Sequence, residues 1–239
     1  MSKGFSIHAK RALDQLMDSD VVTWFTRNDA SRVDASCTPG HSNSDYNRLM
    51  ESYFGRLQIS YAADTFNSYC QSMLGEWLDL HSERWGMISG SFPKEDPVGL
   101  RKKLQQQQAS DRAVREVLRD GLGCFWCPET DVIVVLRNKF VHQNGIDSKR
   151  QVEKEISSKD GKWCDLYPTD LPSRSIPIRY EDGDVLVANF EIGKWANAHI
   201  RNHINFMDQN LCHTYSLPRG PIELKTISRS FGNHAQGVR

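Results

Sequence analysis

The chain has 239 residues, of which 38% are hydrophobic and 25% charged, with 30 basic against 30 acidic side chains. Balanced charge argues against a protein that coats nucleic acid through excess Lys and Arg, although it leaves room for a small local RNA site. No apolar segment approaches the roughly 20 residues of a membrane span, and the N-terminal stretch lacks the apolar region of a signal peptide. We therefore expect a cytoplasmic protein whose six cysteines stay reduced.

Helical patterns dominate the first part of the chain. Apolar spacing predicts a short helix over 6–18, a second short helix in "VVTWF", and a polar loop over 27–47. From about 44 to 84 there is no Pro, and apolar residues recur at helical spacing, which predicts one long helix. Its stripe consists of Ile59, Ala62, Ala63, Phe66, Tyr69, Cys70, Met73, Trp77 and Leu80. Such side chains are typical of a core.

Two shorter helices are predicted next. A charged helix begins near Val98, and its "QQQQ" run is expected to face solvent. In "SDRAVREVLRDGL", Ser110 suits the N-cap of a helix that stops at Gly121. Both helices are interpreted as parts of a bundle.

The second half begins with the most apolar helix. Pro128 suits the first helical position and Asn144-Gly145 signals a left-handed end, so a helix is predicted over about 128–143. Two short β-prone runs around Asp182-Gly183 predict a hairpin within 175–190. A last helix follows, with an imperfect stripe of Ile192, Trp195, Ile200, Ile204, Phe206 and Leu211.

The expected fold class is mainly α, a helical bundle with one small late hairpin. We expect a single domain over 1–239, with a bundle core over about 44–145. A hairpin-plus-helix extension would span 146–215, and the tail over 216–239 is expected to be mobile.

Three polar residues follow the apolar run of the helix over 128–143. Asn138 and His142 share a face, whereas Arg137 lies about 140° from His142 on a helical wheel. Arg137 thus emerges from an apolar flank, where it must reach solvent or find an anion. The helix dipole favours a protonated His142. An Arg suited to phosphate oxygens and a His near its titration range fit phosphoryl chemistry.

The stretch "LRNKFVHQNG" resembles the Arg-x4-6-His signature of HEPN domains, in which the residue after the Arg is often Asn, Asp or His. The resemblance covers the motif well and the helical order over 44–145 more loosely. It implies a helical bundle with the motif near the end of a late helix. Many members are metal-independent endoribonucleases, often toxins or antiviral effectors, that act as homodimers with facing motifs. Others bind RNA or nucleotides without cutting them.

Carried over by position, the resemblance implies that Arg137 contacts the scissile phosphate, His142 transfers a proton and Asn138 orients one of them. An acidic residue on an earlier helix is common in the family, and Asp64 has a similar place. One subgroup has a Tyr two residues after the His, which receives a nucleotide from a partner enzyme; here Asn144 puts that pairing in doubt. The implied partners are RNA, a second copy of the chain and a cognate antitoxin or partner protein, with no cofactor, metal or membrane.

Two functions stay open at this point. The first is RNA cleavage by attack of the ribose 2′-OH, with Arg137, Asn138 and His142 as catalytic residues. The alternative is a non-catalytic module that binds RNA or a nucleotide, or assembles with a protein. The balanced net charge slightly favours the module over a processive nucleic-acid enzyme.

Two further patterns suggest metal ligands. Cys124 and Cys127 have the spacing of a zinc or redox pair, but a closed zinc site needs two more ligands. The sequence offers only Cys164 or Cys212-His213, so packing at a helix start is the preferred interpretation. His199 and His203 lie four residues apart, but no acidic or Cys residue is near them in sequence. We interpret these two histidines as solvated residues of a helix face.

Overall fold

The computed structural model describes residues 6–16, 43–88, 96–143, 150, 153–154, 179–181 and 185–217. The structure over these residues is mainly helical, as predicted. None of the helices in these ranges is long and apolar enough to cross a membrane.

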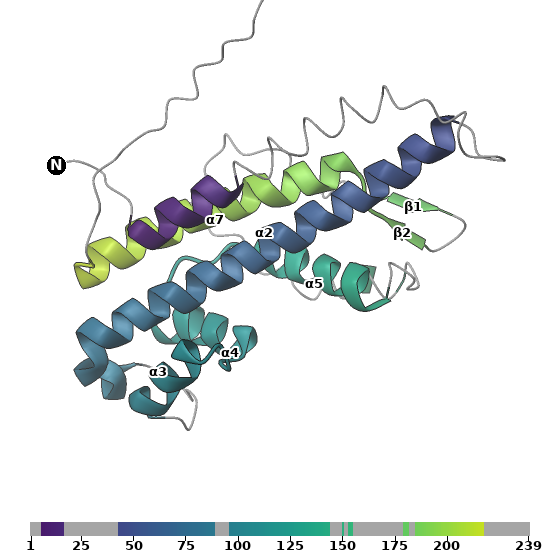
Figure 1. The fold of residues 1–239 in the computed structure, drawn as a ribbon. Coiled ribbons are helices and arrows are strands. Elements are labelled where there is room, and N and C mark those ends of the chain that lie inside the picture. The colour runs from purple at the N-terminus through teal and green to yellow at the C-terminus, as the bar shows by residue number, and fades with distance from the viewer. Residues whose placement is uncertain are drawn as a thin grey trace, which may run out of the picture.

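The two longest helices, α2 (Asn43–His81) and α7 (Phe190–Tyr215), lie side by side and run in the same direction (Figure 1). At one end Gly55 lies so close to Asn189 that a Cβ on the glycine would stand 2.5 Å from the Asn189 carbonyl oxygen. At the other end His81 Nε2 donates to the Tyr215 carbonyl oxygen at 2.8 Å. This pair of helices forms the axis of the bundle.

The helix over 7–16 packs antiparallel to α7, in purple beside it in Figure 1. The backbone N–H of Ser6 donates to Asp208 Oδ2 at 2.9 Å, and the Ser6 hydroxyl also donates to this buried carboxylate. At its other end Arg201 donates to the Leu16 carbonyl oxygen at 3.3 Å. The predicted helix is confirmed over 7–16, where Ile7 is exposed.

α5 (Pro128–Gln143) packs against both α2 and α7 and runs antiparallel to them. The predicted long helix is confirmed over Asn43–His81, and a 3-10 helix, Ser82–Met87, continues it. The predicted stripe of α2 is buried except for Leu80, which is exposed. The largest fully buried side chains on that stripe are Trp77, Tyr69 and Phe66.

α3 (Pro97–Gln105) and α4 (Asp111–Glu116) pack against α2, and one π-helical turn, Val117–Gly121, extends α4. Asp111 accepts hydrogen bonds from Asn67 at 2.9 Å and Gln71 at 2.7 Å, both on α2. Both helices were predicted, and the glutamine run is exposed. The helical segment ends at Gly121, as predicted, and Gly123 has the left-handed conformation two residues later.

Strands β1 (Arg179–Glu181) and β2 (Val185–Val187) pair antiparallel, with Tyr180 opposite Leu186. The turn at Asp182-Gly183 lies outside the described residues. So do the predicted helix in "VVTWF", most of the predicted loop over 27–47, Asn144-Gly145, Cys164, and the tail from 218. β2 leads directly into α7.

The hydrophobic core draws on the N-terminal helix, α2, α3, α4 with its π-helical turn, α5 and α7. Buried side chains of α7 include Ile192, Trp195, Ile200, Ile204 and Leu211, all of them on its predicted stripe. Ala9, Ala12 and Leu16 enter the core from the N-terminal helix. The core therefore includes segments outside 44–145, and the last predicted helix is one of its central elements.

Candidate functional site

α5 carries the predicted site at its C-terminal end. Its first turn holds Pro128, which suits the first helical position, and Glu129 and Asp131, which suit the positive end of the dipole. Near its other end, the Arg56 guanidinium of α2 lies over the Phe140 ring at 5.5 Å from the ring centroid. The antiparallel packing thus brings the last turns of α5 beside the first half of α2.

Arg137 forms an ion pair with an acidic residue of α2. Its Nη2 donates to Asp64 Oδ1 at 3.2 Å, and its Nη1 donates to Asn138 Oδ1 at 3.2 Å. The structure therefore brings Arg137 together with Asn138 and with Asp64, the acidic residue expected on an earlier helix. Arg137 Nε is buried and has no hydrogen-bond partner in the described part of the chain.

The Arg137–Asp64 ion pair is weak enough for another anion to replace Asp64. The side chains of Arg137 and Asp64 are 29% and 55% exposed, so water screens their attraction. Exposed pairs of this kind contribute about 0–1 kcal/mol. A phosphate, which accepts two parallel hydrogen bonds from a guanidinium, can compete with a single carboxylate contact.

His142 lies in the last turn of α5, but its side chain is outside the described part of the structure. The backbone places it five residues beyond Arg137, about 140° around an α-helix. The pairing of Arg137 with His142 therefore stays a prediction.

An exposed apolar stripe on α2 leads to the Arg137–Asp64 pair. Tyr53, Leu57 and Tyr61 are spaced four residues apart, so they share the face of α2 that Asp64 continues. Their exposed fractions are 59%, 51% and 38%. Val141, one turn beyond Arg137 on α5, is 46% exposed. Exposed aromatic and aliphatic side chains thus lie beside the predicted site.

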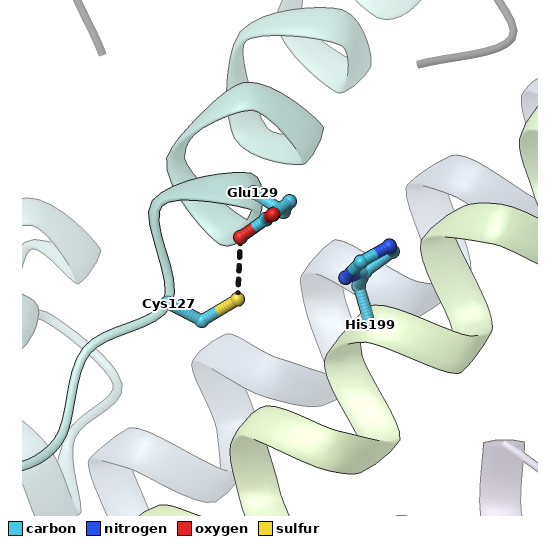
Figure 2. A group of neighbouring side chains, drawn as sticks. All are labelled: Cys127, Glu129 and His199. Atoms are coloured by element: carbon cyan, nitrogen blue, oxygen red, sulfur yellow. Dashed lines mark hydrogen bonds between the residues drawn. The ribbon is translucent and has the colours of Figure 1, made fainter. Parts of the chain in front are cut away.

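A second cluster of reactive side chains lies inside the molecule, at the start of α5. Cys127, Glu129 and His199 are all buried, and their possible ligand atoms lie within 4.8 Å of one another. Figure 2 shows them converging from the segment before α5, from its first turn and from α7. Cys127 Sγ donates to Glu129 Oε2 at 2.8 Å. This is the one such group of three in the described residues.

The neighbouring His203 has a different environment. Its Nδ1 lies 2.6 Å from Thr130 Oγ1, and its Nε2 lies 3.1 Å from the Phe125 carbonyl oxygen. A carbonyl only accepts, so Nε2 carries the proton and Nδ1 accepts from the threonine hydroxyl. Burial lowers the pKa of His203 to about 3 and that of His199 to about 4. Both imidazoles are therefore neutral at pH 7.

The prediction that His199 and His203 are solvated is wrong, because both are buried. α7 is covered by α2 and α5 together, so more than one stripe of its surface is inside. Packing at a helix start was the preferred interpretation of Cys127, and Cys164 or Cys212-His213 were the further ligands that the sequence offered. Glu129 and His199 surround Cys127, whereas His213 is exposed. Glu129, the acidic residue beside His199, lies 70 positions upstream in the sequence, where only the fold could reveal it.

Comparison with models of known protein families, with curated proteins and with solved structures finds no match to this chain.

Proposed function

We propose that the chain is a HEPN-like, metal-independent endoribonuclease whose catalytic residues are Arg137, Asn138 and His142. The observation that carries this proposal is the contact of Arg137 with Asn138 and Asp64 at the end of α5. In this contact Asp64, on an earlier helix, holds the half-buried Arg137 guanidinium. His142 follows in the last turn of α5.

The proposed reaction is attack of a ribose 2′-OH on the adjacent phosphorus, which forms a cyclic phosphate and breaks the bond to the 5′-oxygen. His142 removes the proton from the 2′-OH or returns one to the leaving oxygen. Arg137 stabilises the negative charge that develops on the phosphate oxygens. Asn138 holds the guanidinium through the Arg137 Nη1 contact at 3.2 Å.

The same proposal includes a homodimer. The backbone positions of Arg137 and His142 lie about 140° apart around α5, so one helix does not easily direct both residues at one phosphate. Two copies related by a two-fold axis bring Arg137 of one chain to His142 of the other. The exposed Val141, between these two residues, offers apolar contact at such an axis.

The test is RNA cleavage by purified protein. We expect wild type to cut single-stranded RNA without added metal, and His142→Ala and Arg137→Ala each to reduce the rate by about 10²-fold or more. His213→Ala, at an exposed histidine of α7, is the matched control and should cut at the wild-type rate. Equal cleavage by wild type and His142→Ala, or cleavage by neither, would exclude the nuclease.

A non-catalytic RNA-binding module is the second candidate. The observation that favours it is the exposed stripe of Tyr53, Leu57 and Tyr61, since exposed aromatic rings can stack with unpaired bases. RNA binding that weakens in Tyr53→Ala and Tyr61→Ala, without cleavage by wild type, would select this function over the nuclease.

A further inference from the structure

We propose that Cys127, Glu129 and His199 form a binding site for a zinc-class divalent cation that joins the start of α5 to α7. The three residues offer one sulfur, one oxygen and one nitrogen ligand from separate elements. Zn²⁺ accepts all three atom types, whereas Mg²⁺ and Ca²⁺ select oxygen ligands. The site is independent of the proposed RNA chemistry at the other end of α5.

The geometry requires a small adjustment, in which the sulfur–oxygen pair moves apart and the longer separations shorten. Ligand atoms around tetrahedral zinc stand about 3.5 Å apart, given metal–ligand distances of about 2.0–2.3 Å. The three atoms already lie within 4.8 Å of one another, and Cys127 Sγ and Glu129 Oε2 are 2.8 Å apart. Side-chain rotations of His199 or Glu129 that move their ligand atoms by about an ångström bring the three atoms to bonding distance from one metal ion.

The charges of the three ligands also suit a divalent cation. The Cys127 thiol that now donates to Glu129 loses its proton to solvent when the metal binds. One thiolate and one carboxylate then neutralise a divalent cation, and the neutral His199 adds no charge. An electrically neutral set avoids the large penalty of burying net charge. A water or the second Glu129 oxygen takes the fourth position.

Two other residues near the site, His203 and Cys124, are not among its ligands. His203, one turn along α7, has both ring nitrogens engaged by Thr130 and Phe125, so it is closed to a metal. Cys124, three residues before Cys127, is buried outside the cluster, and burial raises the pKa of its thiol to about 12. The two-residue cysteine spacing therefore does not make a pair of ligands here.

The test uses Co²⁺ added to the purified full chain, because a thiolate bound to Co²⁺ produces a charge-transfer absorption band. Wild type should bind one Co²⁺ per chain with this band, and Zn²⁺ should remove it by displacement. Cys127→Ser should lose the band, and His199→Gln should bind Co²⁺ at least tenfold more weakly. Cys124→Ser is the matched control and should keep the band unchanged.

Three outcomes would overturn the site: no band in folded wild type, a band that survives Cys127→Ser, or a band lost in Cys124→Ser. The measurement on wild type does not depend on how the variants fold, and far-ultraviolet circular dichroism shows whether each variant keeps its helices. RNA cleavage is not a readout, so failure of the nuclease proposal leaves this test intact.

Discussion

At the scale of single residues, His203 shows how a polar side chain is placed inside an apolar bundle. The rings of Phe66, Phe125 and Trp126 surround it, with centroids 4.6, 5.9 and 4.8 Å from its own. Thr130 and the Phe125 carbonyl satisfy its two nitrogens. No charged group is among these neighbours, so burial keeps the imidazole neutral.

This arrangement predicts a pH-dependent stability. The pKa of His203 is about 3 when folded, against about 6.5 when unfolded, so between these values only the unfolded chain takes up this proton. The His203 contribution to the free energy of unfolding therefore falls by about 1.4 kcal/mol for each pH unit below 6.5. We expect His203→Gln, compared with wild type by urea denaturation, to gain about 2 kcal/mol relative to it between pH 6.5 and 5.

His213→Gln is the control, since this exposed histidine lies on the same helix. Its difference from wild type should stay constant over the same range. A constant difference for His203→Gln would show that His203 is protonated, or exposed, in the folded chain.

At the scale of elements, two glycines of α2 have opposite roles. A Cβ on Gly55 would meet the Asn189 backbone at 2.5 Å, whereas a Cβ on Gly75 would meet no atom within 4 Å outside its own helix. Gly55→Ala should lower the free energy of unfolding by about 1–3 kcal/mol, because the α2–α7 contact must open. Gly75→Ala should raise it by about 1 kcal/mol, since Ala favours the helix. Urea denaturation of both variants measures this, and equal signs would contradict the close contact.

The helices also show how much of the fold could be predicted from the sequence. The bounds of α5 and the presence of the long helix α2 and of the N-terminal helix follow from local signals such as Pro128 and the apolar period, and the structure confirms them. Asp64 was identified as an acidic residue of an earlier helix, and it contacts Arg137. The environment of His199 depends on which helices cover α7, and local periodicity does not contain that information.

At the scale of the whole molecule, we predict a symmetric dimer in which residues 132–145 of both chains approach the axis. Light scattering at micromolar concentration should then report twice the 27.3 kDa of one chain. Val141→Glu should shift the protein to monomer by placing a charge in the apolar contact. Val98→Glu, at a 75% exposed position of α3, should leave the mass unchanged. A monomeric wild type would exclude this assembly.

The N-terminal helix has its partners almost at the other end of the chain. Ser6 bonds to Asp208, and Leu16 to Arg201. At synthesis rates of about 5–20 residues per second, a ribosome needs about 10–40 seconds to make the intervening chain. For that time the apolar face of the N-terminal helix has no α7 to cover it, and the apolar face of α2 stays uncovered for the shorter time needed to reach α7. We therefore expect the nascent chain to bind chaperones, and a fragment ending at residue 189 to show no cooperative transition in urea denaturation.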